Sequence, residues 1–228
     1  MTPQRAEVVG ETARRLVARD PGHPLRVGID GACGAGKSTF ARELLAVISA
    51  TGRPAVLVNS DGFHHVRERR YQGRESTRGY YEDAYDFESL ADMVLRPLGP
   101  GGTREYAVRV HDLASDNVVD EWAIAPRHAI VIFDATFIQR RPPRAIDDVI
   151  YLHADEQAAM ARGIARDAAA MGGSDSARAA YNARYMAACR IYLAEQNPRG
   201  RASIVINHTD PAAPVVERTT DRQSVFGE

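Results

Sequence analysis

Residues 31–38 read Gly-Ala-Cys-Gly-Ala-Gly-Lys-Ser and match the G-x-x-x-x-G-K-[ST] pattern of a phosphate-binding loop. Such a loop requires a strand before it and a helix after it, because its backbone N–H groups and the helix N-terminus together face an anion. Residues 25–30 form a short apolar run typical of a strand, and the apolar residues within 40–48 recur at helical spacing. The pattern therefore predicts a strand, a loop and a helix within an α/β fold.

The lysine of this loop, Lys37, is the only lysine among 29 lysine and arginine residues. A compact ammonium on a thin stem can fold back over a phosphate, which the planar guanidinium of arginine does less well. We expect Lys37 to reach the β- and γ-phosphates of a nucleotide and Ser38 to offer its hydroxyl to Mg²⁺. The predicted nucleotide-binding residues follow one another along the chain: Gly31, Ala32, Cys33, Gly34, Ala35, Gly36, Lys37, Ser38 and Thr39.

The composition is that of one globular domain over residues 1–228, with 44% hydrophobic residues and a net charge of -1. The absence of a basic excess argues against a nucleic-acid partner. No run approaches the roughly 20 apolar residues of a membrane span, and no signal-peptide core opens the sequence, so we expect a cytoplasmic protein. The two cysteines, Cys33 and Cys189, are not expected to form a disulfide. The oligomeric state stays open, with a homo-oligomer as one option.

Five apolar runs, separated by helical segments, predict a five-stranded parallel sheet with helices on both faces. They are residues 25–29, 55–58, 129–133, 148–152 and 203–206. A leading helix over residues 3–19 is expected to pack on the outside of the sheet. Residues 61–126 are too many for a simple crossover, and they predict a helix over 87–96 and a β-hairpin over 105–122. Whether the tail from Asp210 onward closes over a nucleotide or is flexible is left open.

Six segments resemble the P-loop kinases related to uridine kinase, phosphoribulokinase and bacterial pantothenate kinase. Besides the loop, they are residues 59–64, 82–90, 130–137, 162–167 and 202–207. The resemblance implies a P-loop NTPase fold and an ATP- and Mg²⁺-dependent transfer of the γ-phosphate to a hydroxyl of a small molecule. It also implies that residues 61–126 are an acceptor-binding insertion and that residues from about 155 to 175 are a helical lid.

Two aspartates follow predicted strands. By the resemblance, Asp61 is expected to orient or deprotonate the acceptor hydroxyl as a general base, and the alternative is a turn or N-cap aspartate. Asp134 ends a buried apolar strand, where an unpaired carboxylate is costly. We expect it to meet Mg²⁺ together with Ser38, partly through water, and the alternative is a capping residue.

Two arginines, Arg162 and Arg166, lie four residues apart and would share one face of a helix. As a lid over the phosphates they would stabilise charge on the transferring phosphoryl group, so we count both as candidate catalytic residues with Lys37 and Asp61. The alternative is a solvated helix face on which Arg166 pairs with Asp167 or a nearby acid.

The favoured acceptor is a nucleoside such as uridine or cytidine. The alternatives are a pantothenate-like acid, a sugar or another hydroxylated metabolite, and, from a different class, a P-loop ATPase switch that binds a protein partner. Adjacent histidines in an extended segment point apart, which argues against a metal site at residues 64–65. The predicted acceptor-binding residues, each of which could instead be a surface residue, are His64, His65, Tyr80, Tyr81, Arg109 and His111.

Overall fold

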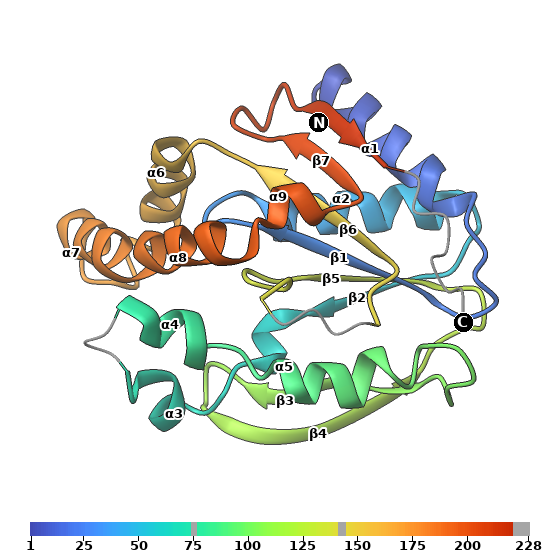
Figure 1. Cartoon of the computed structure of the whole chain (residues 1–228), viewed down its shortest axis with the longest axis horizontal. Coiled ribbons are helices and arrows are strands. Elements are labelled where there is room, and N and C mark those ends of the chain that lie inside the picture. The colour runs from blue at the N-terminus through green and yellow to red at the C-terminus, as the bar shows by residue number, and fades with distance from the viewer. Residues whose placement is uncertain (74–76, 141–144, 221–228) are drawn as a thin grey trace.

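The computed structural model describes residues 1–73, 77–140 and 145–220. Its main sheet has six strands in the order β2-β5-β1-β6-β7-β8 (Figure 1). Their bounds are β1 Leu25–Gly31, β2 Ala55–Asn59, β5 Ile130–Asp134, β6 Asp148–His153, β7 Ile204–Asn207 and β8 Val215–Thr219. The first five of these strands in chain order are parallel to one another and coincide with the predicted runs to within two residues.

The prediction of five strands is wrong by one. The sixth strand, β8, lies in the segment from Asp210 onward, for which the sequence predicted no strand. It pairs antiparallel with β7, from Ile204 opposite Thr219 to Asn207 opposite Val215. It covers an edge of β7 that would otherwise present unpaired N–H and C=O groups. Its apolar content is low, since only Val215 and Val216 are aliphatic, and this explains why periodicity did not reveal it.

Helices cover both faces of the sheet, as predicted (Figure 1). Successive side chains of a strand point to opposite faces. In β5, Ile130 and Ile132 pack in one buried cluster with α1 (Pro3–Val17) and α2 (Lys37–Ala50), whereas Val131 and Phe133 pack in another. A strand buried on both faces needs a continuous apolar sequence, which is the pattern that β5 shows.

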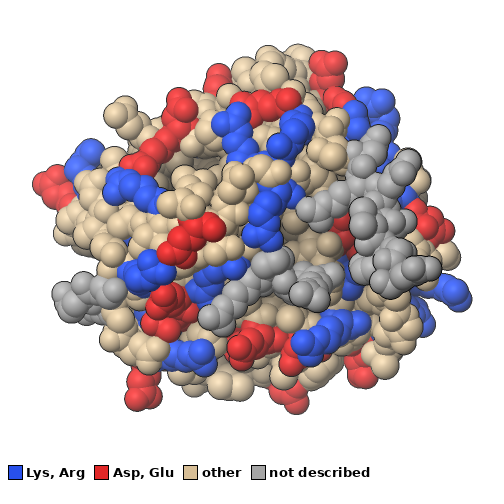
Figure 2. Space-filling view, in the orientation of Figure 1, with Lys and Arg blue, Asp and Glu red and all other residues tan. Residues whose placement is uncertain are grey.

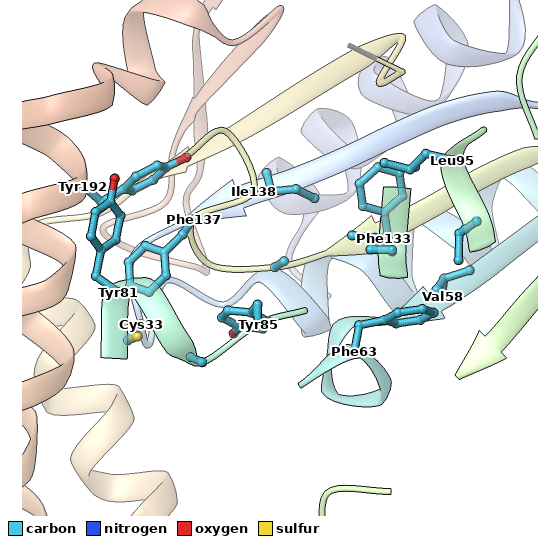
Figure 3. Close-up of a cluster of buried hydrophobic side chains, with 14 of the residues drawn as sticks. Cys33, Val58, Phe63, Tyr81, Tyr85, Leu95, Phe133, Phe137, Ile138 and Tyr192 are labelled. Carbon is cyan, nitrogen blue, oxygen red and sulfur yellow. The ribbon is translucent and has the colours of Figure 1, made fainter. Parts of the chain in front are cut away.

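The second cluster joins the sheet to the insertion and to the C-terminal helices (Figure 3). Phe137, in the loop after β5, lies edge-on to Tyr81 and Tyr192, with ring centroids 5.3 Å away in both cases. These rings come from three distant parts of the chain. Their packing holds the insertion against the carboxyl ends of the strands.

The insertion begins with a short 3-10 turn, η1 (Ser60–Phe63), and contains the predicted hairpin, β3 (Glu105–Asp112) with β4 (Asn117–Ile124), as a separate two-stranded sheet. The predicted helix over 87–96 is present as α5 (Phe87–Leu90) continued by a π-helical turn, η2 (Ala91–Leu95). The remaining helices of the insertion are α3 (Arg67–Tyr71) and α4 (Thr77–Asp83).

After β6 the chain is largely helical. The predicted lid segment holds α6 (Glu156–Asp167) and the first residues of α7 (Ser174–Ala180). A second π-helical turn, η3 (Tyr181–Tyr185), joins α7 to α8 (Met186–Gln196), and α9 (Pro198–Arg201) leads into β7.

Basic and acidic side chains are intermixed over the face seen in Figure 2, in keeping with a net charge of -1. No helix within residues 1–73, 77–140 and 145–220 is long and apolar enough to cross a membrane.

Candidate active site

The phosphate-binding loop lies between the end of β1 and the start of α2, as the motif requires. Gly34 and Gly36 have φ values of 79° and 91°, a left-handed region that glycine enters without steric cost. Packing also excludes a side chain at both positions. A Cβ on Gly34 would lie 2.0 Å from the carbonyl oxygen of Ala159 on α6, and a Cβ on Gly36 would lie 2.8 Å from the His208 ring. The loop is therefore held between α6 and the segment after β7.

The Lys37 side chain folds back along the loop. Its Nζ donates to the carbonyl oxygens of Gly31 and Ala32, at 3.0 Å each. Neither acceptor carries a full charge, so these bonds can be exchanged for phosphate oxygens at little cost.

Ser38 and Asp134 meet at the next position. Ser38 Oγ donates to Asp134 Oδ2 at 2.6 Å, and burial raises the pKa of the Asp134 carboxyl, an effect that the Ser38 hydrogen bond opposes. A hydroxyl and a carboxylate at hydrogen-bond distance, both oxygen donors, form a set that suits Mg²⁺.

Asp61 lies in η1, directly after β2. Its backbone N–H donates to Asn59 Oδ1 at 2.9 Å, while its side chain is 63% exposed and has His64 Nε2 at 3.7 Å from Oδ1. His64 lowers the pKa of this carboxyl most, and the charges of Arg166 and Lys37 lower it further. Asp61 thus occupies a turn, as the alternative reading held, yet its carboxylate faces the same charges that surround the phosphate-binding loop.

One cleft of about 590 Å³ brings most of the predicted site residues together. It lies where the loop, η1, the end of β5 and the C-terminal helices converge. The predicted residues that line it are Cys33, Gly34, Gly36, Lys37, Ser38, Thr39, Asp61, His64, Tyr80, Asp134 and Arg166.

Arg162 does not line this cleft. Its Nε donates to the carbonyl oxygen of Gly34 at 3.0 Å and its Nη1 to that of Thr209 at 2.7 Å. In this conformation Arg162 ties α6 to the loop backbone and to the segment after β7. Its Nη2 is buried and has no hydrogen-bond partner among the described residues.

Arg166 lines the cleft but forms an ion pair with Asp167, which is the alternative that the sequence left open. Its Nε and Nη2 donate to the two carboxylate oxygens of Asp167 at 2.7 and 2.9 Å, and the Tyr181 hydroxyl donates to the same carboxylate at 2.7 Å. Asp167 raises the pKa of Arg166, so the guanidinium stays charged. Its side chain is exposed enough to turn toward a phosphate.

The two predicted acceptor residues on the hairpin, Arg109 and His111, do not line the cleft. Arg109 pairs with Glu121 at 2.7 Å and Asp112 at 2.9 Å, and His111 is buried with Nε2 donating to Asp116 at 3.1 Å. Their partners lie on the hairpin itself and its turn, and the charge of Arg109 is therefore neutralised there.

The other two predicted acceptor residues, His65 and Tyr81, line a different cavity, of about 860 Å³. His65 lies 3.6 Å from Asp86, and Tyr81 packs against Phe137 in the core.

Sequence reasoning missed a buried carboxylate beneath the loop. Asp30, the residue before the loop in β1, accepts hydrogen bonds from the Gly31 N–H at 2.7 Å, from Gln139 Nε2 at 2.8 Å and from the Tyr192 hydroxyl. Burial raises the pKa of this carboxyl. The feature of the sequence that could have revealed Asp30 is a charged residue near the end of a largely apolar strand, which is buried along its whole length.

Two aromatic-flanked arginines of the cleft, Arg70 and Arg184, were also missed. In a chain with arginine throughout, no spacing distinguishes them from surface residues. Cys189 is a third omission, since the Cys33 N–H donates to its Sγ at 3.5 Å and places the two cysteines side by side at the loop.

Comparisons with known proteins identify the family and the fold. A profile of the phosphoribulokinase / uridine kinase family matches residues 26–210. Pantothenate kinase of Streptococcus agalactiae is 33% identical over 92 residues, which are 40% of this chain and 30% of that relative. The matched segment thus spans less than a third of the relative's length.

Solved structures share the fold over most of the chain. A candidate uridine kinase from Bacillus stearothermophilus superposes with a TM-score of 0.69 at 21% identity, over 87% of this chain and 97% of that one. A candidate fructose transport system kinase from Silicibacter sp. TM1040 gives a TM-score of 0.69 at 26% identity, over 86% and 96% of the two chains.

Proposed function

The chain belongs to the phosphoribulokinase / uridine kinase family, and from this premise we propose that it transfers the γ-phosphate of ATP to a hydroxyl of a small molecule. One observation carries the proposal. Lys37, Ser38, Asp61, Asp134 and Arg166, which come from four different elements of the fold, line a single cleft. Phosphoryl transfer asks a protein mainly to position two oxygens in line and to neutralise charge, and these residues supply both needs.

The nucleotide end of the cleft is the loop with α2 behind it. Its backbone N–H groups and the Lys37 ammonium bind the phosphates, and the helix N-terminus adds its positive end. Ser38 and Asp134 would hold Mg²⁺, which would offset the negative charge of the phosphates. Asp134 needs to be ionised for this role.

The acceptor end begins at Asp61. With its pKa lowered, this carboxylate is ionised at neutral pH and can accept the proton of an acceptor hydroxyl that lies against it. Arg166 carries a permanent charge at the same cleft and would move from Asp167 toward the transferring phosphoryl group.

A nucleoside acceptor, the favoured candidate by resemblance, has limited support in the cleft. Of the six residues proposed for acceptor binding, only His64 and Tyr80 line it. The pair Arg70 and Arg184 lines it instead, and this favours an acidic acceptor over a neutral one as the second candidate.

The test is mass-spectrometric detection of phosphorylated product after incubation with Mg²⁺ and ATP. The acceptor panel contains uridine, cytidine, pantothenate, glycerate and common sugars. Asp61→Asn is the diagnostic variant, and Asp92→Asn, which removes an exposed acid paired with Arg96 outside the cleft, is the matched control. The expected result is a product that Asp92→Asn still forms and Asp61→Asn does not.

Turnover of ATP to ADP at the same rate with and without every acceptor, unaffected by Asp61→Asn, would count against a kinase. It would favour the alternative of a nucleotide-dependent switch.

A further inference from the structure

We propose that the acceptor is an anion, a hydroxylated metabolite that carries a carboxylate or a phosphate, and that Arg184 determines this specificity by binding the anionic group. The inference rests on the proposed function and goes beyond it by naming the chemical class of the acceptor. It starts from charges in the cleft that the phosphoryl-transfer machinery does not use.

Most charged residues of the cleft are already balanced. Arg166 is paired with Asp167, and Arg70 with Asp116 at 2.9 Å. Lys37 lies on the phosphate-binding loop itself. These three cations therefore have either an acid or a nucleotide phosphate to neutralise them. A fourth, Arg42, also lines the cleft, but it is an exposed residue of α2 directly behind the phosphate-binding loop.

Arg184 has neither. It extends from η3, and no carboxylate of the described residues forms an ion pair with it. Its Nη2 donates to the carbonyl oxygen of Arg70 at 3.2 Å, while its Nε is buried without a hydrogen-bond partner among those residues. A buried donor left unpaired costs free energy. Arg184 therefore brings to the cleft a charge that no described acid neutralises and a guanidinium whose hydrogen-bonding capacity is not fully used.

The guanidinium is also held in place. Its Cζ lies 4.5 Å from the centroid of the Tyr71 ring and 5.2 Å from that of Tyr80, so the two rings fix its position by cation–π contact. Tyr80 is fixed in turn by edge-on contacts with Phe137 and Tyr185. An arginine that is oriented before the ligand arrives loses little side-chain entropy on binding.

The location suits recognition of one end of an acceptor. Arg184 and Asp61 line the same cleft, so a small molecule whose hydroxyl lies at Asp61 can present a second group to Arg184. A guanidinium in partly buried surroundings selects a planar carboxylate or a phosphate, both of which can accept two of its hydrogen bonds. A neutral sugar or nucleoside would leave its charge uncompensated.

The experiment compares matched pairs of acceptors in the full chain with Mg²⁺ and ATP. The carboxylate arm is glycerate against glycerol and pantothenate against pantothenol, the phosphate arm is fructose 6-phosphate against fructose, and uridine is the neutral reference. We expect product from an anionic member and not from its neutral partner, and the arm that reacts identifies the anion.

Arg184→Gln should raise the KM of the anionic acceptor by roughly 10- to 100-fold, because a hydrogen bond to a charged group contributes about 1.5–3 kcal/mol. The KM of ATP should stay unchanged. Arg127→Gln, at an exposed arginine outside the cleft, is the matched control. Added guanidinium ion should restore part of the lost affinity in Arg184→Ala, a rescue that a purely structural role would not produce.

Binding is read separately, as the rise in thermal midpoint that each probe causes with a non-hydrolysable ATP analogue present. A rise with an anionic probe that Arg184→Gln abolishes supports the inference even where no transfer occurs. The inference is overturned if no anionic probe raises the midpoint, or if uridine or a neutral partner is the better substrate. Failure of transfer to every acceptor counts against the proposed function instead, so the two failures are distinguishable.

Discussion

Ser38 Oγ donates a hydrogen bond to Asp134 Oδ2 at 2.6 Å, joining the first turn of α2 to the end of β5 across 96 positions of sequence. The contact exists because β1 and β5 are neighbouring parallel strands, with Ile29 opposite Asp134. The carboxyl ends of both strands therefore meet at one edge of the sheet, where α/β proteins bind their ligands.

Removing either partner of this pair should weaken Mg²⁺ binding. For Ser38→Ala and Asp134→Asn we expect the Mg²⁺ concentration for half-maximal turnover to rise by about 10- to 100-fold, the range seen when metal-site groups are lost. Magnesium titrations of initial rate measure this. Ser49→Ala, at an exposed position near the other end of α2 and outside the cleft, should change the requirement far less. Equal effects of all three variants would argue against a metal site here.

The Mg²⁺ requirement should also depend on pH. Burial raises the pKa of Asp134 above its ordinary 3.8, so the carboxyl takes up a proton at a higher pH than an exposed aspartate does. Because Mg²⁺ must displace that proton, the apparent affinity should fall as the pH drops toward the raised pKa, and high Mg²⁺ should restore it. Mg²⁺ titrations across a pH series test this, and an affinity independent of pH until 3.8 would contradict it.

Asp61→Asn should lower kcat by roughly 10²- to 10⁴-fold, the usual contribution of a general base. Its KM for ATP should change little. Since His64, Arg166 and Lys37 hold the pKa of Asp61 below 3.8, this carboxylate is ionised at higher pH and loses its charge only on further acidification. At saturating Mg²⁺, protonation of Asp61 should therefore cause no fall in the wild-type rate at any pH above 3.8. A fall near neutral pH under those conditions would contradict the assignment.

The sheet and the phosphate site were predictable because each depends on local signals that the fold preserves. Glycine and lysine spacing defines the loop, Asp134 ends the apolar run of β5, and Asp61 follows the last residue of β2 by two positions. The acceptor side was harder, because it depends on which charges are already paired. Arg109 has acidic partners on the hairpin, whereas Arg184 has none among the described residues, and no sequence pattern separates the two.

Asp30 provides a test of stability. Tyr192→Phe removes a hydroxyl that donates to the buried carboxylate and keeps the ring that packs on Phe137, so we expect a loss of about 1–3 kcal/mol in the free energy of unfolding. Tyr151→Phe is the control, because the Tyr151 hydroxyl is near Asp30 but forms no hydrogen bond with a described residue. Urea denaturation measures both variants.

The pH dependence of this loss has a defined sign. Burial raises the pKa of Asp30 above 3.8, so its contribution to stability is largest below 3.8 and declines as the pH rises toward the folded-state pKa. The Tyr192 hydrogen bond lowers that pKa, and removing it extends the decline to higher pH. The deficit of Tyr192→Phe should therefore grow from acidic to neutral pH. A deficit that stays constant or shrinks over this range would mean that the Tyr192 hydroxyl does not act through the charge of Asp30.

Cys33 should be the reactive cysteine. The neighbouring Cys189 thiol and the Lys37 ammonium lower the pKa of its thiol, whereas the pKa of Cys189 is raised by the same pairing and by burial. A thiolate is the nucleophile, and Cys33 also lines the cleft while Cys189 does not. Iodoacetamide should therefore label Cys33 first at neutral pH, read by peptide mass spectrometry.

Bound nucleotide should slow this labelling, because phosphates held by the loop cover the Cys33 side of the cleft and engage Lys37. With nucleotide at about 100 times its Kd, less than about 2% of the protein remains open to the reagent, so protection should approach this limit. Cys189→Ala is the informative variant, because alanine has no hydrogen-bond donor to replace the thiol. Loss of its thiol removes the largest influence that lowers the pKa of Cys33, so labelling at neutral pH should slow even without nucleotide. Unchanged labelling of Cys33 in that variant would assign its reactivity to Lys37 and the loop N–H groups.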